Sequence, residues 1–170
     1  MFTTRDLAGT VVGFALAFGW TAGALAGDIA ADARVERGRY IVTIGGCNDC
    51  HTDGYLQANG ALPESEWLKG ATVGYQGPWG TTYASNLRLV VSKQTEAQWV
   101  EHARKERLPP MPWFNLREMT DSDLRAVYAY IRSLGASGVA APAYVAPGGK
   151  VTTPYFVFVP QVDQTHAATR

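Results

Sequence analysis

Apolar residues recur at helical spacing in three stretches of the chain. The predicted helices cover residues 28–44, 95–107 and 121–134. Asp28 or Asp32 can cap the N-terminus of the first helix. Thr95 and Gln98 have the spacing of a capping box at the start of the second helix, and Thr120 is placed to cap the third. The pattern therefore predicts a mainly helical protein.

The first and last of these helices are expected to pack against each other. Gly38 in a helix interior costs about 1 kcal/mol relative to alanine, which favours a close approach of another helix, with Tyr40 packing beside the contact. The last helix carries an apolar stripe at residues 124, 127, 128, 131 and 134 that suits this contact. Two alternatives remain open: Gly38 only frays a surface helix, or the stripe faces a binding pocket instead.

The segment after residue 136 differs in composition from the rest of the chain. Ala, Gly, Val and Pro dominate as far as Gly149, as in a linker. Residues 153–160 are strongly apolar and typical of a β-strand. We predict an irregular, Pro/Gly-rich C-terminal extension over residues 137–170, which packs on the body as an extended arm or serves to dock a partner.

The N-terminus has the pattern of a secretory signal peptide over residues 1–26. Arg5 precedes an uncharged apolar run, and Ala24-Leu25-Ala26 fits the small-x-small cleavage pattern. The alternative is an uncleaved membrane anchor, because the uncharged run approaches spanning length. The first interpretation predicts a periplasmic protein. The second predicts one held at the inner membrane and facing the periplasm.

Charge and composition narrow the class of function. The 170-residue chain has 15 basic and 15 acidic residues, so its formal net charge is zero. A neutral chain gives no reason to expect binding to nucleic acid or to an anionic membrane surface. The only two cysteines are three positions apart, so no disulfide framework is indicated.

Those cysteines belong to the most informative motif of the chain, Cys47-Asn48-Asp49-Cys50-His51. The pattern C-x-x-C-H is typical of c-type haem attachment. Each thiol forms a thioether with one porphyrin vinyl group, and His51 then lies beneath the iron as an axial ligand. A structural zinc site would need further Cys or His ligands at suitable spacing, and the remaining histidines, His102 and His166, are isolated.

The turn-rich stretch of residues 52–86 is long for a loop in a compact domain. A large buried cofactor accounts for it, since loops can wrap a porphyrin and bury apolar residues against it. Trp67, Trp79 and Tyr83 are the candidates for this wall, with polar tips that can reach the haem propionates. Ordinary packing aromatics are an equally good interpretation of each.

Met111 is the candidate for the second axial ligand. Three prolines, at positions 109, 110 and 112, stiffen the loop around it, and a thioether is a soft ligand suited to haem iron. The rival is Met119, but it precedes the predicted cap Thr120 and can form a hydrophobic staple with Leu124. His102 lies in a charged run and is expected at the surface.

With these features together, residues 34–135 resemble the class I cytochrome c family. The resemblance rests on the C-x-x-C-H motif, the proline-flanked Met111 and the apolar face of the last helix. The Gly77-Pro78-Trp79-Gly80 segment and Pro110-Met111-Pro112 are similar to cytochrome subunits of alcohol and aldehyde dehydrogenases. Those subunits usually carry three haem motifs, whereas this chain has one.

The resemblance implies an all-α cytochrome c fold of about three to five helices wrapped around one covalently bound haem c, over residues 27–136. It implies Cys47 and Cys50 as attachment points and His51 and Met111 as axial ligands. The expected function is one-electron transfer, not catalysis. The expected partners are a dehydrogenase as donor and a cytochrome or terminal oxidase as acceptor. Membrane contact is expected only if the N-terminal segment stays uncleaved.

Two other classes stay open as alternatives. A peroxidase-like haem enzyme needs an open sixth position on the iron and a distal acid–base group. A haem-based redox or gas sensor needs a displaceable methionine ligand.

Overall fold

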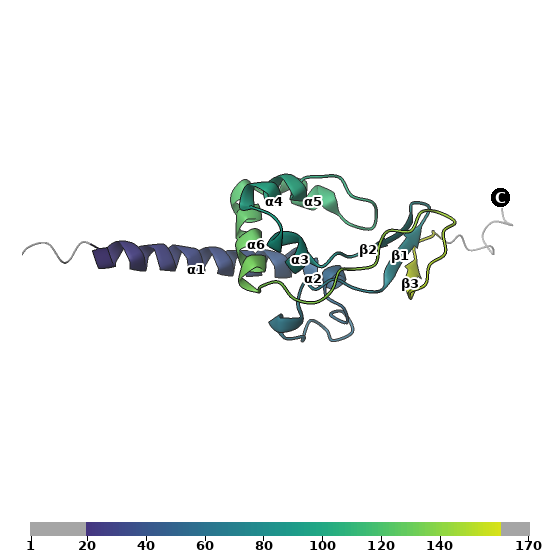
Figure 1. Ribbon diagram of the computed structural model, residues 1–170, viewed down its shortest axis with the longest axis horizontal. Helices are drawn as coiled ribbons and strands as arrows, with labels where there is room; N and C mark the ends of the chain where they lie inside the picture. Colours follow the sequence, from purple (N-terminus) through teal and green to yellow (C-terminus); the bar gives the residue numbers. More distant parts are fainter. Residues whose placement is uncertain (1–19, 161–170) are drawn as a thin grey trace, which may run out of the picture. The chain divides into compact units, whose positions relative to one another are not determined.

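The computed structural model describes residues 20–160 of the chain. In this range there are six α-helices: α1 (Trp20–Ile44), α2 (Cys47–His51), α3 (Leu87–Ser92), α4 (Glu96–Ala103), α5 (Trp113–Glu118) and α6 (Asp121–Ser133). A 3-10 helix, η1 (Glu64–Glu66), and strands β1 (Gly74–Gly77), β2 (Gly80–Tyr83) and β3 (Tyr155–Val157) complete the described elements (Figure 1). The predicted mainly helical class is confirmed, with the small sheet as an addition.

The chain divides into two compact units, residues 1–32 and 33–170, and all the described elements except residues 20–32 of α1 belong to the second. Helix α1 ends at Ile44 as predicted but begins at Trp20, so the predicted start near Asp28 is wrong. Three alanines and a leucine among residues 20–27 favour the helix, although Gly23 and Gly27 do not. Residues 1–19 of the predicted signal peptide, which covers residues 1–26, lie outside the described residues. Cleavage after Ala26 stays a prediction.

Helices α1 and α6 meet at Gly38, as the sequence predicts. A Cβ atom on Gly38 would lie 2.0 Å from the backbone oxygen of Ala126 and 2.7 Å from Cβ of Tyr130. The two backbones are therefore so close that only glycine fits. Tyr40 does not pack beside this contact: it is 53% exposed, because it lies on the outer face of α1, where Arg37 stacks over its ring.

Helix α6 presents its apolar stripe to the core. The Thr120 side chain accepts a hydrogen bond from the amide of Asp123, which confirms the predicted cap. The residues of α6 that are buried are Leu124, Ala126, Val127, Tyr130 and Ile131. Tyr128 and Leu134 of the predicted stripe are only partly buried and pack against the edge of the core.

Helix α4 begins with the predicted capping box, in which Thr95 and Gln98 exchange both hydrogen bonds. It ends at Ala103, earlier than predicted. The guanidinium of Arg107 donates to the carbonyl oxygen of His102 and so satisfies an acceptor at the end of the helix. Helices α3 and α5 are short and were not predicted. The Asn86 side chain caps α3 by accepting from the Leu89 amide.

The turn-rich stretch contains a hairpin, in which β1 and β2 pair antiparallel around Pro78 and Trp79. Strand β3, from the C-terminal apolar stretch, pairs parallel with the other edge of β1 and gives the sheet order β2-β1-β3 (Figure 1). The β-prone character of residues 153–160 thus appears as a strand that closes onto a hairpin about 80 residues earlier in the chain.

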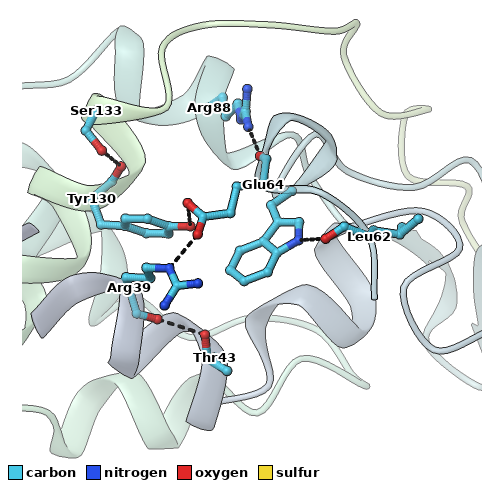
Figure 2. A network of polar contacts seen from close by, with 8 residues as sticks. Arg39, Thr43, Leu62, Glu64, Arg88, Tyr130 and Ser133 are labelled. Carbon is cyan, nitrogen blue, oxygen red and sulfur yellow. Dashed lines mark hydrogen bonds and ion pairs between the residues drawn. The ribbon is translucent and has the colours of Figure 1, made fainter. Parts of the chain in front are cut away.

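A polar network around Glu64 ties the long loop to the helices (Figure 2). The Glu64 carboxylate accepts from Arg39 of α1 and from the hydroxyl of Tyr130 of α6, while its backbone oxygen accepts from Arg88 of α3 at 2.6 Å. Burial raises the pKa of Tyr130, and the nearby Glu64 carboxylate adds a smaller increase. The hydroxyl of Tyr130 therefore stays protonated and acts as a donor. One residue of η1 therefore links three helices.

Between residues 20 and 160, no helix combines the length and the apolar character that crossing a membrane requires.

The Gly38 contact gives a test of the fold. Gly38→Ala should lower the free energy of unfolding by about 1–3 kcal/mol, because its Cβ overlaps backbone atoms of α6. Tyr40→Ala, two residues away on the exposed face, should change it by less than about 0.5 kcal/mol. Denaturant unfolding of both variants measures this. Equal midpoints for the two variants would contradict the helix contact.

Candidate functional site

A cavity of about 680 Å³ lies among α2, β2, α4, α5 and α6. Its size suits a large planar cofactor. Its apolar lining includes Val42, Leu87, Leu116, Val127 and Ile131. The sequence left open whether the apolar stripe of α6 packs on the first helix or faces a binding pocket. Helix α6 does both, since it contacts Gly38 of α1 and its Val127 and Ile131 line the cavity.

The haem motif lies at the wall of this cavity. Gly46 has φ +65°, which ends α1 and lets α2 begin in a new direction. Cys47, Cys50 and His51 of this single helical turn all line the cavity. Burial raises the pKa of the Cys47 thiol to about 11, and the carboxylate of Asp49 adds to the effect. The two cysteines are thiols, not a disulfide.

The imidazole of His51 has one nitrogen fixed and one available. Its Nδ1 lies 2.7 Å from the backbone oxygen of Ser85, and because a carbonyl only accepts, Nδ1 must carry the proton. Burial lowers the pKa of His51, although the bond to Ser85 acts in the opposite direction. The neutral ring then has a lone pair on Nε2, the form that binds a metal ion.

Met111 lines the same cavity from the proline-rich loop. This loop is anchored to β2, where the Thr82 hydroxyl donates to the backbone oxygen of Pro109 at 2.9 Å. The Met111 carbonyl accepts from the Trp113 amide at 2.9 Å, which closes a turn at the start of α5. The thioether is thus presented by a loop with few conformations of its own.

The rival, Met119, also lines the cavity. It differs from Met111 in its packing, because it lies against the hydrophobic core that contains Leu124. Its backbone oxygen accepts a hydrogen bond from Arg104, which also pairs with Asp121 at the start of α6. Met119 therefore combines a structural position at the α5–α6 turn with access to the cavity.

His102 is not the surface residue that the sequence predicts. It is half-buried, lines the cavity and stacks on Trp99 with ring centroids 6.1 Å apart. Burial, with Arg107 and Lys105, lowers its pKa. The charged neighbours of His102 in the sequence do not indicate its position, because only one face of α4 is turned to the core. Trp99 and Ala103 are buried on that face, and His102 lies at its border.

Of the three aromatic residues predicted to form a wall of the haem site, only one lines the cavity. Trp67 is buried in the core, where its indole donates to the Leu62 carbonyl, and Trp79 contacts the hairpin and Phe158, just after β3. Neither lines the cavity. Tyr83 does line it. Tyr75 and Tyr144 also line the cavity and were missed, since nothing in their local sequence distinguishes them from surface tyrosines.

These side chains fit a covalently bound haem. One cavity brings together two thiols, an imidazole with a free Nε2 and two thioethers, and its other walls are mainly apolar. Soft sulfur and imidazole donors in an apolar cavity are the set that haem iron and the porphyrin require.

Comparison with known proteins points the same way. The family model for cytochrome c matches residues 35–135. The chain is 32% identical over 121 residues to the cytochrome c subunit of a quinone-dependent alcohol dehydrogenase from Komagataeibacter europaeus, which is 65% of this chain and 24% of that protein. It is also 32% identical over 118 residues to the gluconate 2-dehydrogenase cytochrome c subunit of Pantoea cypripedii, covering 63% and 24%.

A third relative is one of the subunits of nicotinate dehydrogenase from Pseudomonas putida, 25% identical over 114 residues, 59% of this chain and 9% of that protein. The chain thus spans a quarter or less of the length of these curated relatives. No solved structure matches the chain.

The anchoring of the Met111 loop can be tested directly. Thr82→Val removes the donor to Pro109 and should ease local opening of the loop by about 0.5–1 kcal/mol, so the Trp113 amide exchanges faster with solvent. Thr82→Ser keeps a hydroxyl and should retain the slow exchange. Hydrogen–deuterium exchange measures both, and equal exchange in wild type and Thr82→Val would contradict the anchor.

Proposed function

The chain belongs to the cytochrome c family, and from that premise we propose that it is a periplasmic single-haem carrier that passes one electron at a time from a dehydrogenase to a downstream cytochrome or terminal oxidase. Its cofactor is haem c, bound covalently, and the family and relatives support electron transfer as its activity. The observation that carries the proposal is the single cavity lined by Cys47, Cys50, His51 and Met111.

In this proposal Cys47 and Cys50 would hold the porphyrin through thioethers, and His51 and Met111 would bind the iron. A bound haem would supply one-electron chemistry, since its iron can be ferric or ferrous. The bond from Nδ1 of His51 to Ser85 orients the imidazole and strengthens Nε2 as a donor. The Thr82–Pro109 bond holds the loop of Met111 in place.

The surroundings of the proposed haem favour the reduced state. A methionine ligand stabilises ferrous iron relative to a second imidazole, which raises the reduction potential. Apolar side chains such as Val127 and Ile131 exclude water and disfavour the more highly charged ferric site in the same direction. The proposed carrier thus has a higher potential than a solvent-exposed, bis-histidine haem.

The proposed donor and the proposed location are supported by different observations. The relatives named above are subunits of dehydrogenases, which supports a dehydrogenase as the electron donor. The signal-like pattern of residues 1–26 supports export to the periplasm, with Gly27 as the mature N-terminus.

Intact-mass measurement of the denatured periplasmic protein tests attachment and export together. Wild type should have the mass of residues 27–170 plus one haem, because thioethers survive denaturation. The Cys47→Ala, Cys50→Ala double variant should lack the haem mass. Haem lost from wild type on acid extraction would refute covalent attachment through these cysteines. A mass that includes residues 1–26, with the protein in the membrane fraction, would instead indicate an anchored carrier.

The sixth ligand is tested with the two methionines. Met111→Ala should remove the methionine-to-iron absorption band of the ferric protein and lower the reduction potential, because water or another side chain replaces the thioether. Met119→Ala should cost about 1–2 kcal/mol of stability through lost packing and leave the spectrum unchanged. The reverse pattern would assign the ligand to Met119.

A peroxidase-like haem enzyme is the second candidate, and the position of His102 in the cavity is the observation in its favour. This function requires a sixth position without methionine in the native ferric protein. The same spectrum therefore separates the two functions: a methionine band in wild type supports the carrier. Its absence, together with peroxide turnover that His102→Ala abolishes, would support the enzyme.

A further inference from the structure

The segment from Ser137 onward lies outside the region matched by the cytochrome c family, yet it returns to the cavity. Its first anchor is the buried Asn86, whose amide donates to the backbone oxygens of Ser137 at 2.8 Å and Val139 at 3.1 Å. Asn86 directly follows Ser85, the residue that accepts from His51. The segment is therefore attached next to the support of the proposed iron ligand.

A second anchor brings Tyr144 to the rim of the cavity. Thr81 of β2 and Val145 exchange two backbone hydrogen bonds, at 2.8 and 3.0 Å. The Tyr144 hydroxyl donates to the backbone oxygen of Trp79 at 2.7 Å. Gly80 permits this approach, because a Cβ there would lie 2.4 Å from the Val145 oxygen. The hydroxyl of Tyr144 is thus satisfied by the hairpin, and the half-exposed Tyr144 lines the cavity.

A third anchor is the stretch of residues 153–158, which contains β3 and contacts two tyrosines of the hairpin. The Thr153 hydroxyl lies 2.8 Å from the hydroxyl of Tyr83. The rings of Phe156 and Phe158 lie 6.0 and 5.8 Å from that of Tyr75, to which β3 is also tied by strand pairing. Pairs at these separations favour one another by about 0.5–1.5 kcal/mol beyond their buried area.

All three tyrosines that line the cavity in the described part of the chain, Tyr75, Tyr83 and Tyr144, are thus supplied or held by residues 137–158. We propose that this segment is a fitted wall of the haem cavity, in which Tyr144 covers the rim and Thr153 is a positioning residue for Tyr83. The proposal rests on the proposed use of the cavity for haem.

The consequence is electrochemical. A wall that keeps water from the porphyrin disfavours the ferric state, so the segment holds the reduction potential above that of the same domain without it. The effect depends on the ring of Tyr144 and on the position of Tyr83, not on the apolar surface that β3 exposes elsewhere. The proposal therefore predicts that substituting two residues of the same type within this segment changes the reduction potential in one case and not in the other.

The holoprotein with full-length variants tests this. Tyr144→Ala should lower the reduction potential and increase the shift of the haem absorption when the solvent is perturbed with ethylene glycol. Tyr144→Phe keeps the ring and should stay near wild type. The matched control is Tyr155→Ala, which removes a half-exposed tyrosine of β3 that does not line the cavity, and it should move neither readout.

A second pair keeps the proposal testable if Tyr144→Ala fails to fold. Thr153→Val should move both readouts in the same direction, and Thr152→Val, the exposed neighbour, should move neither. Equal readouts for wild type, Tyr144→Ala and Thr153→Val would overturn the proposal, as would equal shifts in the test and control variants. Retention of covalent, redox-active haem in all of them would leave the carrier function standing, so the two failures are distinguishable.

Discussion

The contact of α1 with α6 at Gly38 is the constraint on which the site depends. Helix α1 ends at Ile44, and the haem motif begins at Cys47, so the position of this helix fixes the position of both thiols and of His51. Helix α6 provides the apolar floor of the same cavity. Because the backbones meet where any side chain would overlap Ala126, the distance between motif and floor is set by main-chain atoms. Because main-chain atoms define this contact, the two helices can shift little relative to each other. This suits a cavity that must match a rigid porphyrin.

The other side of the cavity is organised by one short segment, residues 82–86. Thr82 anchors the Met111 loop, Ser85 orients His51, and Tyr83 and Asn86 hold the C-terminal segment. In three of these four cases a side chain donates to a backbone oxygen, an acceptor that no point substitution removes. Both proposed iron ligands and the proposed wall thus share one support, although they are distant in sequence. This convergence explains how a long irregular stretch can belong to a compact domain.

Features that depend on neighbouring residues could be predicted from the sequence, whereas contacts between distant segments mostly could not. The haem motif, the Thr95–Gln98 box, the Thr120 cap and the Gly38 contact are readable because each depends on residue types at fixed local spacing or on a glycine where a helix disfavours it. The extended start of α1, the short helices α3 and α5 and the hairpin were missed, since they are brief or lack a strong period. His102 and Tyr144 were missed as cavity residues for a different reason. Their positions follow from which face of α4 is buried and from the pairing of Thr81 with Val145, and neither is encoded in neighbouring residues.

The contrast between Met111 and Met119 shows how much of an electron carrier's design concerns rigidity. A ligand that serves both oxidation states must stay in place when the charge of the iron changes, so the protein has to define its position beforehand. Met119 obtains that definition from the core, but its backbone is engaged at the α5–α6 turn, and moving it would disturb the helix that forms the floor of the cavity. Met111 obtains it from prolines on both sides and from the Thr82–Pro109 bond, none of which is part of the core. The position of Met111 is therefore defined without involving α6, which is the physical reason to favour Met111 when both thioethers line one cavity.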